Sequence, residues 1–196
     1  MNLGDSAQAS DNINAMMNAG AIVSDDLPIK GILNFECHDA DGNLLWQEIV
    51  ENLVTTVGKN QILNSAYSSS AYTSAEYMGL ISSVGFTALA AGDTMSSHAG
   101  WNEAQNTGTN TPSYGTVRPT LTYGAASGGV ISTSSTNSFV ATSAGTVQGA
   151  FVVGGSGASA TVANTGGVLM NEGTLGTPQP VISGNTVTIG HTLTLT

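Results

Sequence analysis

The run Asp39-Ala40-Asp41-Gly42-Asn43 is the segment of this sequence that most resembles a metal-binding loop. Its carboxylate and amide side chains can present several oxygen ligands to Ca²⁺. An EF-hand loop also needs a Glu at a fixed later position and a helix on each side, and this run has neither. An Asp-Gly β-turn of type I′ explains the same residues without an ion. We therefore interpret the run as a hairpin turn and expect no bound metal.

Two further groups contain the residue types of nucleophilic catalysis. Cys37 and His38 offer a thiol beside a base, but neighbours on a strand point to opposite faces, and Cys37 falls on the apolar side with Phe35. The second group has the residue types of a hydrolase triad: Asp93, Ser96, Ser97 and His98. A working triad converges from separate parts of a fold, and its Ser usually lies in a Gly-x-Ser-x-Gly turn, which this sequence lacks. We expect no catalytic residue in either group.

Carboxylates and tryptophans leave two weaker alternatives open. Glycoside cleavage needs two facing carboxylates, and the sequence after residue 51 offers four acids for such a pair: Glu76, Asp93, Glu103 and Glu172. Trp46 and Trp101 have rings that can stack on sugars, although two Trp residues in a β-sandwich are more often core or interface anchors. His191 falls on an apolar strand face, which favours a hydrogen-bonded or interface histidine. We expect neither an enzyme nor a cofactor.

Negative charge is concentrated in the first quarter of the chain. The sequence has 196 residues and a formal net charge of −10, and residues 1 to 51 hold nine of its 13 acids but only one of its three bases. Nucleic acids and anionic membranes are bound through Lys and Arg clusters, so we expect neither as a partner. No window is apolar enough for a membrane span or an export signal. The single cysteine excludes an intramolecular disulfide, which is compatible with folding in a bacterial cytoplasm.

A β-hairpin begins the main body, which we place at residues 28–196. Leu33, Phe35 and Cys37 alternate with polar residues, Asp41-Gly42 forms the turn, and residues 44–50 return as the partner strand. The apolar spacing then changes, and residues 52–67 fit one face of a helix.

Further strands are predicted from alternation between turn-rich clusters. The predicted segments are residues 77–81, a strand containing Val117, Leu121 and Tyr123 on one side, and residues 130–142, 146–153, 160–169 and 186–196. Strands at this spacing with one helix predict an all-β fold, specifically a jelly-roll-like antiparallel sandwich.

Residues 1–27 differ from the body and predict an extended N-terminal arm. They lack aromatic residues and contain five apolar residues that we expect to form an interface: Ile13, Met16, Met17, Ile22 and Val23. The first three have helical spacing, but a helix of about eight residues is too short to persist alone in water. We expect the arm to become ordered on a partner. The alternative, a frayed terminus without a role, stays open at this stage.

Several motifs of the body resemble a known family. Gly79-Leu80-Ile81 precedes the run Ala-Ala-Gly-Asp-Thr-Met-Ser-Ser-His-Ala-Gly-Trp-Asn-Glu at 90–103, which is followed by Arg118-Pro119 and Tyr123-Gly124-Ala125-Ala126-Ser127. The pattern resembles small virion proteins of tailed bacteriophages over roughly residues 28 to 196. Many such proteins are known only as predicted structural proteins, and the family has no chemical motif to carry over.

The resemblance implies a structural protein of the virion. We expect a capsid decoration or cement protein that binds the major capsid protein on the outer shell, associates with itself as a homo-oligomer, most simply a trimer, and is made in the host cytoplasm. Such a protein would bind through many weak contacts summed over the oligomer. The alternative is a tail-fibre or receptor-binding protein that holds a glycan.

Overall fold

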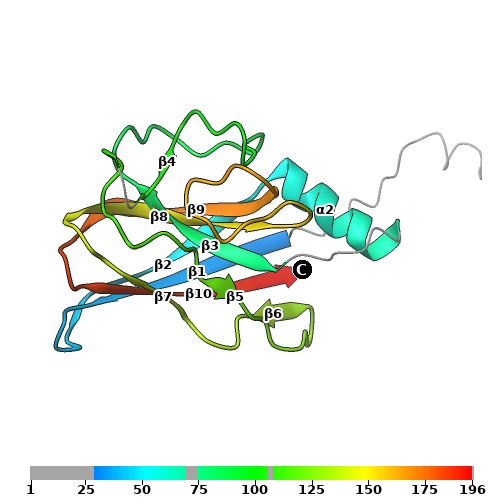
Figure 1. Cartoon of the computed structure of the whole chain (residues 1–196). Helices are drawn as coiled ribbons and strands as arrows, with labels where there is room; N and C mark the ends of the chain where they lie inside the picture. Colours follow the sequence, from blue (N-terminus) through cyan, green and yellow to red (C-terminus); the bar gives the residue numbers. More distant parts are fainter. Residues whose placement is uncertain (1–28, 69–74, 106–107, 196) are drawn as a thin grey trace, which may run out of the picture.

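A computed structural model describes residues 29–68, 75–105 and 108–195 of the chain (Figure 1). The predicted arm and its interface residues Ile13, Met16, Met17, Ile22 and Val23 lie outside these ranges. The elements are β1 (Ile29–His38), β2 (Leu44–Val54), α2 (Thr56–Tyr67), β3 (Glu76–Ser82), β4 (Asn102–Glu103), β5 (Thr120–Leu121), β6 (Val130–Ser132), β7 (Asn137–Val140), β8 (Gly145–Gly154), β9 (Val168–Val181) and β10 (Thr186–Leu195).

The strands form an antiparallel sandwich, which confirms the predicted all-β class. The first sheet contains β2, β1 and β10, with β6 and β7 on the outer side of β10. The second contains β9, β8 and β3, with β4 and β5 beside β3. The end of β2 joins the two sheets, because Leu53 and Val54 pair with Glu172 and Asn171 of β9. Figure 1 shows the two sheets as layers, with β1 and β10 below β8 and β9. The narrower jelly-roll prediction stays a prediction.

Two apolar cores hold these layers together. The main core lies between the sheets and includes Phe35, Leu80, Val152 and Ile189, all nearly or completely buried. A second core lies on the other face of the second sheet, where the segment between β3 and β4 covers it with Met95 and Trp101. In Figure 1 these covering loops lie above β8 and β9. The central strands of the second sheet are therefore buried on both faces, as β8 shows from Val147 to Gly154.

The residue types of β9 explain why this strand was not predicted from the sequence. We predicted a strand over residues 160–169 and none immediately after it, whereas β9 runs from Val168 to Val181 and residues 160–167 form an irregular segment. The buried first half of β9 includes Asn171, Glu172 and Gly173, so it shows no run or alternation of apolar residues. Gly173, Gly176 and two prolines within β9 also resemble a turn in the sequence.

Other predicted boundaries also need correction. The segment at 130–142 divides into β6 and β7, and the strand with Val117, Leu121 and Tyr123 on one side shortens to β5. Leu121 is buried whereas Val117 is exposed, so they do not share an inward face. By contrast, residues 77–81, 146–153 and 186–195 form β3, β8 and β10 as predicted. The predicted end of the last strand, Thr196, lies outside the described residues.

The helix begins four residues later than predicted. Residues 52–54 extend β2 because they complete its pairing with β9, and Thr55 is the helix N-cap, accepting a hydrogen bond from the Gly58 amide at 3.0 Å. Gly58 lies directly on β9: a Cβ atom there would be 2.2 Å from the Met170 carbonyl oxygen. The predicted hairpin is confirmed, since β1 pairs with β2 across their full overlap. Among the described residues, no helix is long and apolar enough to cross a membrane.

Candidate interaction surface

The predicted metal-like run is organised as a turn. The Asp39 carboxylate accepts hydrogen bonds from the Asp41 amide at 2.9 Å, the Asn43 amide at 2.8 Å and the Asn43 side chain at 2.9 Å. The hydrogen bonds from Asn43 are the main cause that lowers the pKa of Asp39. Gly42 alone in the run has a positive φ, 85°, so the turn is not the predicted type I′, which needs positive φ at both central residues. No cluster of potential metal ligands occurs in the described ranges.

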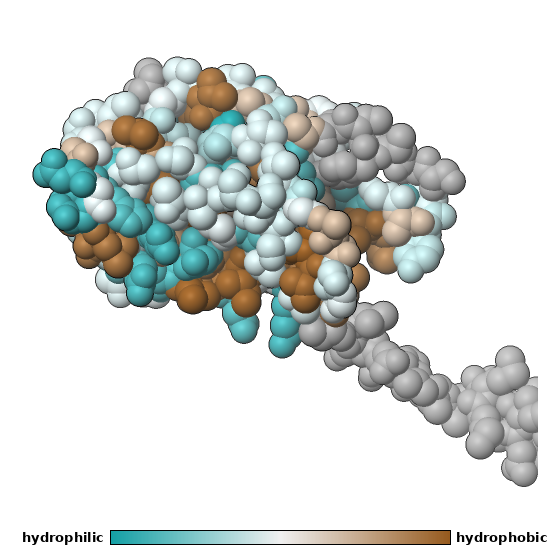
Figure 2. All heavy atoms as spheres, turned by 90° about the horizontal axis from the view of Figure 1, so that it is seen from below, coloured by the Kyte–Doolittle hydropathy of each residue, from teal (hydrophilic) through white to brown (hydrophobic). Residues whose placement is uncertain are grey.

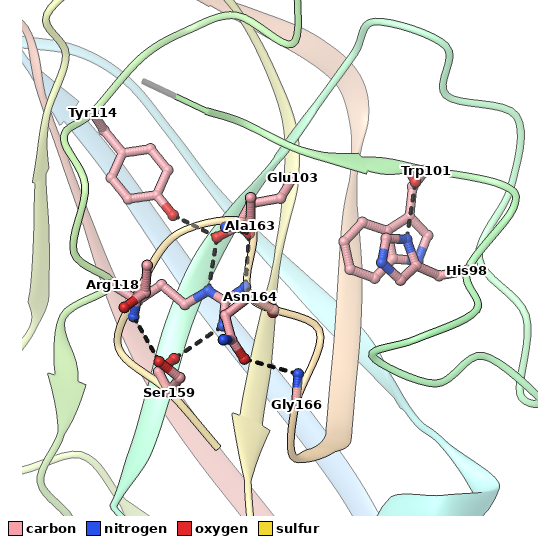
Figure 3. A network of polar contacts seen from close by, with 10 residues as sticks. His98, Trp101, Glu103, Tyr114, Arg118, Ser159, Ala163, Asn164 and Gly166 are labelled. Atoms are coloured by element: carbon pink, nitrogen blue, oxygen red, sulfur yellow. Dashed lines mark hydrogen bonds and ion pairs between the residues drawn. The ribbon is translucent and has the colours of Figure 1, made fainter. Parts of the chain in front are cut away.

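Glu103 and Arg118 form a buried ion pair that is part of the fold's internal support (Figure 3). Arg118 donates to both Glu103 carboxylate oxygens, and its remaining hydrogen bonds go to the carbonyl oxygens of Ser159 and Asn164. Glu103 also accepts from the Tyr114 hydroxyl and from the Ala163 amide. Every polar group of the pair therefore has a partner inside the protein, and the pair ties the loop before β9 to β4.

Asp93 and Glu172 form a second buried group beneath the covering loops. Asp93 accepts a hydrogen bond from the Trp101 indole nitrogen at 3.2 Å, and the Ala90 amide lies within hydrogen-bonding distance of both carboxylates. Burial, reinforced by the charge of Asp93, raises the pKa of Glu172 to about 8. Two of the four predicted carboxylates thus lie together, but Glu172 is completely buried, and a glycosidase needs both carboxylates facing the substrate.

Trp101 cannot stack on a sugar, because its ring is already covered. It is 1% exposed, stacks on His98 at 3.8 Å between ring centroids and packs against Phe151 at 4.9 Å. The other candidate ring, Trp46, donates its indole hydrogen to the Pro180 carbonyl oxygen at 3.1 Å. Trp101 is therefore a core anchor, the role expected as the alternative to sugar binding, and Trp46 anchors β2 to β9.

The remaining candidates for catalysis also have internal roles. His98 Nδ1 contacts the Trp101 carbonyl oxygen at 3.0 Å, and Asp93 bonds Trp101, so these residues do not converge on Ser96 or Ser97. Burial raises the pKa of the Cys37 thiol to about 11, which keeps it protonated at neutral pH.

His191 forms a third buried polar group, with residues from three other segments. Its ring nitrogens lie 2.7 Å from the Tyr123 hydroxyl and 3.0 Å from Asn52 Nδ2, which in turn donates to Asn171 Oδ1 at 2.9 Å. Burial lowers the pKa of His191 to about 4, so the ring is neutral at physiological pH. This arrangement agrees with the predicted hydrogen-bonded histidine and links the two sheets.

The outward-facing side chains of the β1–β2 hairpin form the most distinctive exposed surface of the described chain. Leu44, Leu45 and Ile49 are 51%, 50% and 70% exposed. Four acids of the same hairpin accompany them: Glu36, Asp39, Asp41 and Glu51. The fifth acid of the hairpin, Glu48, points inward and accepts a hydrogen bond from the Gly176 amide. We call Leu44, Leu45, Ile49 and these four acids the hairpin surface. Figure 2 shows hydrophilic and hydrophobic residues side by side at the end of the molecule where Figure 1 places this hairpin.

The rest of the body contributes little exposed negative charge. Of the four acids after residue 51, Asp93, Glu103 and Glu172 are buried and Glu76 is half-buried. The negative field of the described body therefore originates mainly at the hairpin, where charges are screened by solvent but remain accessible to a partner.

β2 is also an edge strand along most of its length. Within the described chain it pairs with β9 only through Leu53 and Val54, so the stretch from Leu44 to Asn52 has β1 on one side alone. Two inward side chains fasten this edge to β9: Trp46 through Pro180, and Glu48 through the Gly176 amide at 2.7 Å. The fastening leaves Leu45 and Ile49 on the outer face. Long edge strands with exposed apolar residues are sites for association.

Leu44, Leu45 and Ile49 were not selected from the sequence as interface residues. The signal was present, because alternation along residues 44–50 places Ile49 on the face opposite Val50, in register with the exposed Asn34. An Ile at an outward position of a hairpin rich in acids is a signal for contact with a partner.

No protein-family model, curated protein or solved structure matches this chain.

Proposed function

We propose that this protein is a structural protein of a bacteriophage virion that decorates the outer capsid shell. The observation that supports this function best is the hairpin surface, where exposed Leu and Ile side chains lie among the acids of the body. Contact with the shell is assigned to this surface. The major capsid protein would supply a complementary patch of apolar and basic residues.

In this proposal, the apolar residues of the hairpin surface provide affinity and its acids provide electrostatic selectivity. Burial of an Ile or Leu side chain contributes about 1.5–3 kcal/mol, so a few such contacts give useful affinity once several subunits bind together. The acids speed encounter with a basic patch and exclude acidic surfaces, and their effect decreases as salt rises. This division fits a protein that must bind one surface in many copies.

The second candidate function is glycan binding by a tail-fibre or receptor-binding protein. A shallow hollow of about 330 Å³ on the first sheet is lined mainly by hydroxyl and amide side chains, including Asn34, Ser134 and Thr192. Such groups can hydrogen-bond a sugar, but the lining residues include no Trp, Tyr or Phe ring for stacking. We therefore place glycan binding second.

A binding assay with particles stripped of decoration tests the first proposal. Ile49→Ser should weaken retention of the protein on the particles about tenfold or more, because the lost burial is worth at least about 1.4 kcal/mol. Val117→Ser is the matched control, since Val117 is also exposed, at 62%, and lies on the segment before β5. It should bind as the unchanged protein does.

A charge series separates the electrostatic part of the same contact. Asp41→Asn and Glu51→Gln each remove one exposed charge of the hairpin surface and should reduce the salt dependence of retention. Equal binding by all the hairpin variants would contradict the assignment of this surface. Loss of binding by Val117→Ser alone would move the contact to the neighbourhood of β5.

A further inference from the structure

An apolar groove opens at the end of the sandwich opposite the hairpin. It has a volume of about 210 Å³ and is lined by the side of α2 and the ends of three strands: Ile29, Ile62, Val130, Ile131, Leu193 and Leu195. We call it the α2 groove. Figure 1 shows α2 projecting beyond the sheets at this end, beside the C-terminal end of β10, and Figure 2 shows apolar residues gathered there.

The α2 groove is an opening of the main core. Ile62 packs against that core from α2, while Leu195 remains 54% exposed at the rim. A second hollow, of about 380 Å³, shares Ile62 and continues between α2 and β9, where its lining is mixed and includes Gln61, Ser65 and Glu76 beside Ala66 and Met170. Among the described residues, the lining of the α2 groove itself has no charged or polar side chain, so it excludes ions and favours aliphatic side chains. The groove therefore suits an apolar segment of polypeptide.

The 28 residues that precede Ile29 supply a segment of matching chemistry. Ile29 is itself part of the groove wall, so the chain leaves the described body at this place. Within the preceding residues, Ile13, Met16 and Met17 have the spacing of one helix face, and Ile22 and Val23 follow. Methionine side chains adapt well to irregular apolar grooves.

The sequence between residue 23 and β1 favours binding of the arm to the α2 groove of a neighbouring subunit over binding to the groove of its own subunit. Pro28 disfavours the helical conformation at Leu27, which makes a tight helical reversal at this position unfavourable. Only a few residues then remain for a reversal before Val23, and they include Asp25 and Asp26, which an apolar groove would not accept. We infer that the arm segment 13–23 of one copy docks into the α2 groove of a second copy and links the subunits of a homo-oligomer.

Disulfide trapping between full-length chains tests this inference. In a background where the buried Cys37 is replaced by Ala, one protein carries Met17→Cys and the other carries Ile131→Cys. When the two are mixed and gently oxidised, a disulfide-linked heterodimer should form in high yield. Each protein oxidised alone is the first control, and a partner carrying Val140→Cys, on an exposed site of β7, is the second.

The results separate the possible occupants of the groove. Efficient trapping with Ile131→Cys but not with Val140→Cys supports the inference. A heterodimer yield no higher than in the controls overturns it. A single chain carrying both cysteines then shows whether the arm returns to its own subunit, because it would form an internal disulfide without dimers.

A measurement of oligomer size without engineered cysteines provides an independent check. Sedimentation of Met16→Ser/Met17→Ser and of the rim variant Leu195→Ser should show a shift toward monomer relative to the unchanged protein at the same concentration. Val117→Ser serves as the exposed-residue control and should leave the distribution unchanged. An unchanged distribution for both groove-directed variants contradicts the inference, whatever the result of the capsid-binding assay.

Discussion

Arg118 binds Glu103 through two parallel hydrogen bonds, from Nε to Oε1 at 2.8 Å and from Nη2 to Oε2 at 2.7 Å, in a site where the two residues are 1% and 5% exposed. A buried ion pair of this kind is stabilising only when its remaining polar groups also have partners. Here Tyr114, Ala163, Ser159 and Asn164 supply them, and the Arg118 guanidinium lies 5.3 Å from the centre of the Phe151 ring. The pair therefore fixes the loops around β4 and β9.

Removing Arg118 alone should be strongly destabilising. Arg118→Met leaves the Glu103 carboxylate buried without its counter-ion, which should lower the free energy of unfolding by about 3–5 kcal/mol. Urea denaturation of the variant and of the unchanged protein measures this difference. The double variant Arg118→Met/Glu103→Leu should lose less than the sum of the two single changes, because no unpaired charge remains. A loss below about 1 kcal/mol for Arg118→Met would contradict the assigned role.

The hairpin turn should depend on glycine at position 42. Gly42 has φ of 85°, and a Cβ atom there would meet nothing within 4 Å, so a substitution causes backbone strain and no clash. Gly42→Val should cost about 1–3 kcal/mol in unfolding free energy, whereas Gly42→Asn should cost less because Asn tolerates this conformation. Thermal melting of the two variants tests the assignment, and equal melting temperatures for the Gly42→Val and Gly42→Asn proteins would speak against it.

Stability should decrease as pH rises toward 8 because of Glu172. Its pKa is raised from the ordinary value of 4.5 to about 8 in the folded protein, mainly by burial and then by the charge of Asp93. The folded state thus holds a proton that the unfolded state has released. The contribution of Glu172 to the free energy of unfolding is fully present below about pH 4.5 and is lost as pH rises through about 8. Between these values the free energy of unfolding decreases by up to about 1.4 kcal/mol per pH unit.

His191 acts in the opposite direction, which determines where the Glu172 effect can be measured. Its folded pKa is about 4 against 6.5 in the unfolded chain, so its contribution is complete above about pH 6.5 and lost as pH falls through about 4. Denaturation between pH 7 and pH 8 therefore reports mainly on Glu172. Glu172→Gln should flatten the profile in this range, and an equally steep decline in the variant would contradict the assignment.

Removal of divalent metal should leave the protein's stability unchanged. The oxygens of Asp39 are used in hydrogen bonds with Asp41 and Asn43, so the turn is complete without an ion. The melting temperature should be the same in excess chelator and in millimolar calcium. A calcium site occupied at 100 times its Kd would instead add about 2.7 kcal/mol, a clear upward shift that would restore the calcium-loop interpretation.

Strands with one buried face and one solvent-exposed face were predicted correctly from the sequence. Phe35 and Ile189 lie in strands with clear alternation, and both strands were predicted. β9 was missed because its buried first half contains Asn171, Glu172 and Gly173, residue types common at the surface or in turns, and its second half contains Gly176 and two prolines. The buried polar contacts could not be predicted from local patterns either, because their partners are far apart in the sequence. Asn52 and His191, for example, are separated by 139 positions.

The exposed apolar residues of the hairpin surface could likewise not be identified from the sequence. Its acids were visible as a charge asymmetry of the sequence. The exposure of Ile49 became evident only when pairing with β1 fixed which face of β2 is turned outward. The alternation of apolar and polar residues predicts the hairpin. Which of its apolar residues is exposed depends on how the hairpin packs against the rest of the fold.

The number of copies of this chain in the purified virion tests the proposed function most directly. Quantitative densitometry against the major capsid protein should find tens to hundreds of copies per particle, and a particle reconstruction should place them on the outer shell with the β1–β2 hairpin facing it. A few copies per particle, located at the tail, would contradict decoration of the capsid and favour the glycan-binding alternative.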